Sequence, residues 1–175
     1  MKINLLFVIL LSGFGAHAQI SPIREISFVE EYITSKNKWE KAKALHNDSY
    51  QFTLHQISET EGFTKHTTIT VKNGTITERS YQQFNNGMND RERLKYSWTE
   101  DQAHINSHGD GIVAFTFDKI YENCITMHLS QDTEDYKIIF QIDAYGMLAT
   151  CGSTKLNCER DCFLGYEVVK FEWFE

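Results

Sequence analysis

Histidines and cysteines are the residues of this 175-residue chain whose types and spacing could support chemistry. His104 and His108 are four residues apart, a spacing that puts two imidazoles on one face of a helix and can hold a metal ion. The glutamate of an H-E-x-x-H site is missing, and a glycine follows His108 directly. We therefore expect two exposed histidines beside a helix end, without a metal ion or another cofactor.

The second candidate is the set of four cysteines, which could bind zinc or pair as two disulfides. They are Cys124, Cys151, Cys158 and Cys162. C-x-x-C knuckles are absent, and an exported protein meets oxidising conditions, so we expect two disulfides. Sequence alone decides none of the three possible pairings. The simplest is a Cys151–Cys162 bridge across the last sheet loop, which would leave Cys124 to pair with Cys158.

An export signal is predicted at the N-terminus, over residues 1–18. Lys2 supplies a positive charge, residues 3–11 form an apolar core, and an A-x-A cleavage pattern ends at Ala18. The apolar core is shorter than the ~20 residues that span a bilayer. We therefore expect a removable signal, no membrane span, and a mature protein in the periplasm or outside the cell. The absence of a cysteine directly after the apolar core argues against a lipid anchor.

Composition favours a folded domain that does not bind nucleic acid. Residues 19–175 have the length of one ordinary domain, and one proline with 13% aromatic residues argues against disorder. The formal net charge is −7 and no basic stripe is present, so nucleic acid and anionic membranes are poor partner candidates. The expected partner is an unidentified protein or a small ligand. The oligomeric state stays open.

The elements that would position these residues begin with a helix. Ser21-Pro22 is a typical helix start, and an apolar stripe follows at three- and four-residue spacing. The stripe consists of Ile23, Ile26, Val29 and Ile33. Asn37 and Glu40 resemble a second helix start that would run to about His46, so one bent helix and two helices both remain possible.

Strands follow the helical region. Tyr50, Phe52 and Leu54 alternate with polar residues, as in a half-buried strand. Asn73-Gly74 separates two β-branched runs and predicts a hairpin in which Val71 pairs with Ile76. Further strands are expected over residues 136–142, over residues 147–151 and over residues 163–174, where Val169, Phe171 and Trp173 alternate with charged residues. A polar loop over residues 152–160 is expected before the last of them.

The central part of the chain is more polar. Residues 85–93 are expected to form a loop, and Thr99 with Gln102 predicts a capping box for a short helix that carries His104. Thr116 is the expected cap of a further helix containing Phe117, Ile120, Tyr121 and Cys124. Trp98, beside the polar segment, is the tryptophan that we expect to be exposed, where it could anchor a partner.

Five segments together resemble an uncharacterised family of small exported bacterial domains of unknown function. They are Trp39 with Tyr50-Gln51-Phe52, the strand end Thr70–Gly74, the helix start Thr116–Ile120, the turn Asp143–Leu148, and the closing cysteines. The resemblance extends from about Trp39 to the end of the chain. It implies a helix-plus-sheet module, secreted or lipid-anchored, and supplies no catalytic or ligand-binding residue. This chain lacks the lipobox of common members and carries an additional polar segment over residues 85–110.

The sequence thus predicts one α+β domain. We expect an antiparallel sheet of about five to six strands, two to three helices packed on one face, and a C-terminal hairpin stapled by a disulfide. The expected function is that of a non-enzymatic exported accessory or binding module. A small metal-binding protein or a hydrolase that uses His104 and His108 or scattered acids is the alternative. No residue is assigned as catalytic, metal-binding or cofactor-binding.

Overall fold

The computed structural model describes residues 23–85 and 93–174, and the side chains from Phe28 onward. The predicted export signal and most of the predicted loop at 85–93 lie outside these residues. The described residues contain two α-helices, α1 (Ile23–Leu45) and α2 (Phe117–Asn123). The strands are β1 (Tyr50–Ser58), β2 (Phe63–Lys72), β3 (Thr75–Asn85), β4 (Arg93–Asp101), β5 (Tyr136–Ile142), β6 (Leu148–Lys155) and β7 (Phe163–Trp173).

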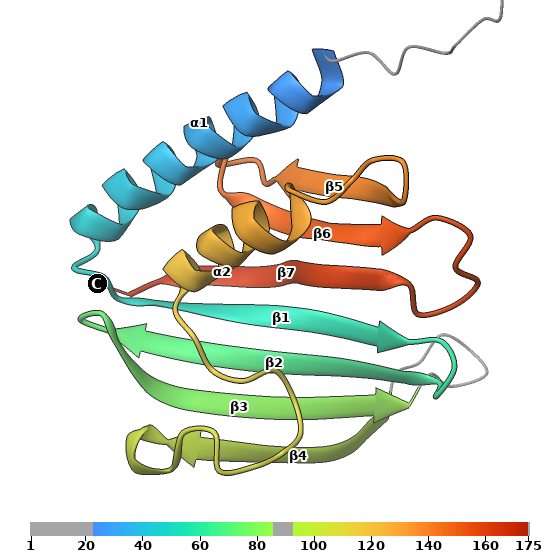
Figure 1. Cartoon of the computed structure of the whole chain (residues 1–175). Helices are drawn as coiled ribbons and strands as arrows, with labels where there is room; N and C mark the ends of the chain where they lie inside the picture. The colour runs from blue at the N-terminus through green and yellow to red at the C-terminus, as the bar shows by residue number, and fades with distance from the viewer. Residues whose placement is uncertain (1–22, 86–92, 175) are drawn as a thin grey trace, which may run out of the picture.

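The seven strands form one antiparallel sheet in the order β4-β3-β2-β1-β7-β6-β5. Two meanders, β1 to β4 and β5 to β7, are joined where β1 pairs with β7. Figure 1 shows both helices in front of the same face of the sheet. The sheet has more strands than the five to six expected, because residues 93–101 form a strand where the sequence indicated the approach to a short helix.

Helix α1 is continuous, so of the two possibilities left open the structure has a single helix, and no second helix begins at Asn37. The apolar stripe of the sequence is not the buried face where side chains are described, because Val29 and Ile33 are 45% and 51% exposed. The face turned to the sheet instead carries Tyr32, Ser35 and Trp39, at helical spacing. Aromatic side chains bury more apolar area than valine or isoleucine, so they determine how the helix is oriented on the sheet.

Trp39 is the centre of the core and is fully buried. Its ring centroid lies 5.0 Å from that of Tyr50 in β1, 4.8 Å from that of Phe117 in α2 and 5.3 Å from that of Trp173 in β7. Its indole N–H donates a 2.9 Å hydrogen bond to Asp118, so the buried polar group is satisfied. A single side chain therefore joins both helices to the middle of the sheet.

The hairpin predicted at Asn73-Gly74 is confirmed. Lys72 pairs with Thr75 and Val71 pairs with Ile76, as the two-residue turn requires. Asn73 and Gly74 have φ angles of 49° and 73°. Both turn positions are thus left-handed, as in the turn type that Asn-Gly favours.

A β-bulge interrupts the pairing of β7 with β1. Thr53 pairs with Lys170 but Leu54 pairs with Val168, so Val169 has no partner in β1. The extra residue shifts the alternation, and Val168 as well as Phe171 therefore packs against the core. The prediction that Val169 lies on the core face is wrong, since its side chain is 49% exposed.

All four cysteines are paired, which confirms the two expected disulfides, but the expected pairing is wrong. The disulfides are Cys124–Cys151 and Cys158–Cys162. Cys151 lies within β6, since this strand continues to Lys155 through part of the predicted loop, and its side chain faces α2. Cys158 and Cys162 both lie in the loop between β6 and β7, so that disulfide closes the loop on itself and does not staple the hairpin.

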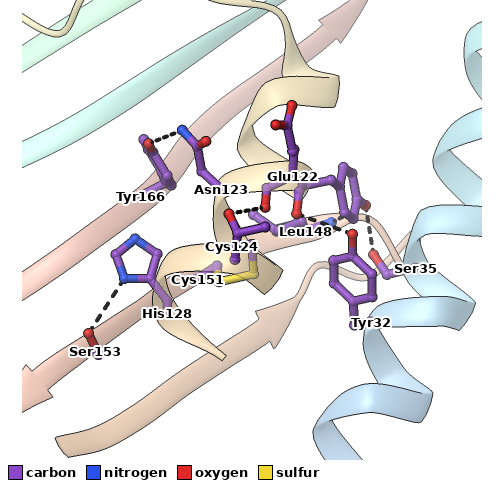
Figure 2. Close-up of a disulfide and its surroundings, with 12 residues drawn as sticks. Tyr32, Ser35, Glu122, Asn123, Cys124, His128, Leu148, Cys151, Ser153 and Tyr166 are labelled. Carbon is purple, nitrogen blue, oxygen red and sulfur yellow. Dashed lines mark hydrogen bonds between the residues drawn. A yellow bond between two sulfur atoms is a disulfide. The ribbon is translucent and has the colours of Figure 1, made fainter. Parts of the chain in front are cut away.

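The Cys124–Cys151 disulfide joins the second helix to the sheet (Figure 2). Cys124 begins a π-helical turn (Cys124–His128) that continues α2, and Thr116 is the N-cap of α2 as predicted. Hydrogen bonds on both sides support the bridge, from Asn123 to the Tyr166 hydroxyl at 2.7 Å and between His128 and Ser153 at 3.4 Å. This disulfide is completely buried.

No helix in the described part of the chain is both long and apolar enough to cross a membrane.

Candidate functional site

An apolar groove lies between α1, the β5–β6 turn and β7, and has a volume of about 740 Å³. We call it the α1–β7 groove. Its volume lies within the range of pockets that bind small molecules, ~300–1,000 Å³, and such pockets are mostly lined by apolar and aromatic side chains.

The sheet side of the groove is formed by the C-terminal part of β7. Val168, Phe171 and Trp173 contact the core and also line the groove. Val169 reaches the groove because the bulge frees this residue from pairing with β1. A bulge commonly redirects a side chain at a binding site, and here it presents two consecutive valines to the same groove.

The turn between β5 and β6 forms the second wall. Asp143 accepts hydrogen bonds of 2.9 Å from the backbone N–H groups of both Tyr145 and Met147, which fixes the turn. Gly146 completes it with a φ of 80°, a conformation that L side chains rarely adopt. The turn holds Tyr145 at the groove, where this side chain is 82% exposed, while Met147 is almost completely buried in the floor.

Helix α1 forms the third wall with Lys38, Lys41, Ala42 and Leu45. Their spacing of three, four and seven residues places them on one stripe of the helix. The stripe is ordered by polarity, because the two lysines come first along the helix and Ala42 and Leu45 follow. Leu45 is 84% exposed, so a large apolar side chain is accessible to solvent where the groove meets the C-terminal end of α1.

The lysines of the groove differ from those on the opposite flank of α1. Lys36 and Lys43 both contact Asp118, at 3.2 Å and 2.9 Å. Burial alone would raise the pKa of Asp118, but hydrogen bonds from Lys43, Trp39 and Lys36 hold it below its ordinary value. By contrast, no carboxylate among the described residues lies within ion-pair distance of Lys38 or Lys41.

His104 and His108 are not brought together as a pair. The helical turn after β4 covers only Gln102–His104, and its N-cap is Asp101 rather than Thr99. His104 donates a 2.7 Å hydrogen bond to Asp101, whereas His108 donates one of 3.0 Å to Glu100. As expected, both histidines are exposed and lie beside the end of a short helical turn, and they do not share a helix face. In the part of the chain that the structure describes, no cluster of three or more His, Cys, Asp or Glu residues is arranged to hold a metal ion.

His108 belongs to a cluster around a buried ion pair, Arg79 with Glu100, that sequence reasoning missed. We call it the Glu100 cluster, and it comprises Arg79, Glu100, Asn106, Ser107 and His108. The carboxylate of Glu100 is inaccessible and lies 3.2 Å from the Arg79 guanidinium. It also accepts hydrogen bonds from the backbone N–H groups of Asn106 and His108, at 2.8 Å and 2.6 Å, and from the Ser107 hydroxyl at 3.1 Å.

The Glu100 cluster fixes the segment after β4 to the sheet. Burial alone would raise the pKa of Glu100, but the hydrogen bonds from His108, Asn106 and Ser107 lower it to about 2. Arg79 donates to the backbone carbonyl of Asp110 and to the side chain of Asn106. Both oxygens of the Glu100 carboxylate thus accept hydrogen bonds that hold this segment in place, and neither is left to act on a substrate.

Trp98 is part of the same arrangement and is half-buried, not exposed as we expected. Its ring stacks on His108 with centroids 4.4 Å apart and on Tyr81 at 5.4 Å, and Arg79 lies over it at 4.7 Å. Trp98 therefore packs against the Glu100 cluster, and these contacts leave little of the ring surface available to anchor a partner.

Two signals in the sequence could have revealed these sites. Lys38, Lys41, Ala42 and Leu45 have helical spacing, but they lie in the region where the sequence left one bent helix and two helices both possible. Arg79 and Tyr81 are two residues apart on β3, so the confirmed hairpin register already placed the arginine on the same face as a buried tyrosine.

Residues 31–109 match the model of a family of unknown function, DUF6174, which confirms the expected similarity to a domain of unknown function. The matched segment contains strands β1 to β4, most of α1 and the Glu100 cluster. The Thr116–Ile120 and Asp143–Leu148 segments, on which the expectation also rested, lie outside it. The α1–β7 groove combines both parts, because its helix lies inside the match while β7 and the β5–β6 turn lie outside. No curated protein and no solved structure matches the chain.

Proposed function

We propose that this protein is an exported, non-enzymatic binding module and that the α1–β7 groove is its ligand site. The observation that carries the proposal is the groove itself, a volume of about 740 Å³ walled by a helix, a turn and a bulged strand. Its apolar side chains include Leu45, Tyr145 and Val169, which are 84%, 82% and 49% exposed. An exposed apolar surface that is concave and rimmed by charge is typical of a binding site.

Export is supported by two features. The pattern of residues 1–18 is that of a signal peptide, and every cysteine of the chain is engaged in a disulfide. The resemblance on which we rely also implies a bacterial source, with the periplasm or the cell exterior as the location. Catalysis receives no comparable support, because His104, His108 and Glu100 are all used in contacts that fix the chain segment after β4.

The proposal is tested by titrating the purified protein with the neutral dye Nile red, whose fluorescence rises in an apolar site. We expect saturable binding that Val169→Asp weakens by about tenfold or more, since a carboxylate would then lie among apolar groups. The matched control is Val113→Asp, because Val113 is 62% exposed in the connection before α2 and does not line the groove. Equal binding by the two variants, or no saturable binding by the unaltered protein, would contradict the proposal.

A further inference from the structure

The charges around the α1–β7 groove have a sign opposite to that of the whole chain. Lys38, Lys41 and Lys170 line the groove, together with a single carboxylate, that of Asp143. The chain as a whole has a formal net charge of −7. A cationic rim on an acidic protein concentrates anions at this place, while the rest of the surface repels them.

Two of the three lysines are available to a ligand. Lys170 lies 3.0 Å from Glu172, and Asp143 accepts two backbone hydrogen bonds within its own turn. Lys38 and Lys41 have no such carboxylate partner among the described residues. The side chain of Lys38 extends over Gly146, where any larger residue would collide with it. The turn thus leaves room for an ammonium group directly at the edge of the groove.

The groove is also polarised along its length. Lys38 and Leu45 are separated by seven residues of helix, which corresponds to about 10 Å along the α1 axis. The lysine end therefore carries the positive charge, and the end with Leu45 and Trp173 is apolar. A matching ligand has an anionic group at one end and an apolar chain that reaches about 10 Å beyond it.

We infer that the ligand of the α1–β7 groove is a single-chain amphiphile with an anionic end group, which Lys38 and Lys41 bind while its chain lies against Val169, Trp173 and Leu45. This inference rests on the proposed function, since it assigns the ligand class of the same groove. The charge complementarity of the lysine end selects this ligand over an uncharged apolar molecule.

The test compares dodecanoate with dodecanol, which have the same chain length and differ in charge at neutral pH. Both are used to displace Nile red from the purified protein, below the concentration at which either aggregates. Dodecanoate is expected to displace the dye at an about fivefold to tenfold lower concentration than dodecanol, as two exposed ion pairs would provide. Added salt should reduce this preference, because it screens the two ammonium groups.

Variants attribute the preference to the two lysines. Lys38→Met with Lys41→Met removes both charges and keeps side chains of similar length, so dodecanol binding should persist while the preference for dodecanoate disappears. The matched control is Lys137→Met with Lys155→Met, which changes the net charge equally at exposed positions outside the groove. This control should keep the full preference.

Three results would overturn the inference. Equal displacement by the two ligands would show that the groove binds apolar chains without regard to charge, which leaves the proposed function intact. An equal loss of preference in both double variants would assign the effect to the overall charge of the protein. A dimer that dissociates on Val169→Asp would place a second copy of the chain in the groove. A failure of Nile red itself to bind would instead remove the proposed function.

Discussion

The connection between β4 and β5 is fixed to the sheet at two places by different chemistry. Near β4, the Glu100 cluster binds the chain with an ion pair and hydrogen bonds. Near β5, the Cys124–Cys151 disulfide binds it with a covalent bond. Between these two places the chain crosses the sheet and forms α2 (Figure 1). Phe117 and Tyr121 of this helix are completely buried.

The Glu100 cluster and the Cys124–Cys151 disulfide differ in what each attachment requires of its surroundings. A buried carboxylate is stable only if every hydrogen-bond position is filled, and Glu100 meets this condition with donors from four residues. A disulfide needs only correct geometry and protection from reductants, and Cys124 and Cys151 are both inaccessible. The first should therefore respond to acid and to the loss of one partner, and the second to reduction alone.

The largest effect is expected from Glu100→Gln. This change leaves the buried Arg79 guanidinium without a charged partner, and such a loss typically costs about 3–5 kcal/mol. Urea unfolding of the variant would measure the decrease in the free energy of unfolding. The control is Glu122→Gln, since the Glu122 side chain is 61% exposed and pairs with Lys119 at the surface. A decrease of similar size in both variants would show that the Glu100 cluster has no special role.

Replacement of Cys124 and Cys151 by alanine should have the next largest effect. The disulfide closes a loop with a sequence separation of 27 residues, and its removal is expected to cost about 3.5 kcal/mol through the entropy of the unfolded chain. The same urea experiment measures it, and the near-ultraviolet circular dichroism of the aromatic core checks that the variant still folds. A smaller loss of stability than that caused by removing the Cys158–Cys162 disulfide would contradict the comparison.

Acid should lower the stability contribution of the Glu100 cluster but not that of the Cys124–Cys151 disulfide. The pKa of Glu100 is lowered from 4.5 to about 2 in the folded protein, so its contribution to stability is fully present above pH 4.5 and is lost as the pH falls toward 2. The difference in unfolding free energy between the unaltered protein and Glu100→Gln should accordingly shrink over this range. The difference for the Cys124 and Cys151 variant should stay nearly constant. A constant difference for Glu100→Gln would mean that this carboxylate is not held ionised by its hydrogen bonds.

The smallest effect is expected from the Cys158–Cys162 disulfide. Its sequence separation is 4 residues, so the loop-closure entropy amounts to only about 2 kcal/mol. It also lies in an exposed loop, where Asp161 accepts a 2.7 Å hydrogen bond from the backbone of Glu59 in the β1–β2 turn. Thiol counting during titration with dithiothreitol should therefore find this disulfide reduced first. Reduction of Cys124–Cys151 before it would contradict the burial of that bridge.

Local features of the fold were predictable because they depend on a few neighbouring residues. Asn73-Gly74 determines a turn through the φ angles that asparagine and glycine tolerate, and the register of the hairpin follows. The helix start at Thr116 likewise reflects a cap and the spacing of Phe117 and Tyr121. That the cysteines pair at all followed from the signal-peptide pattern and the absence of metal-site spacing.

The candidate site was not predictable, because each of its parts depends on contacts between distant segments. Which face of α1 is buried was decided by aromatic residues of α2, β1 and β7 that surround Trp39, and the flank of the helix with Lys38, Lys41 and Leu45 became a wall of the groove. The bulge at Val169 arises from pairing with β1, more than 110 residues earlier in the chain.

The sequence by itself determined the turn, the strand periodicity and the presence of disulfides, since these follow from short-range conformational preferences and from the number and spacing of the cysteines. Only the tertiary structure decided which cysteines pair, which carboxylate is buried and where the groove lies. These features depend on which side chains come into contact when β1 pairs with β7. The free energies of burial and pairing act between residues in contact in space, whatever their separation along the chain.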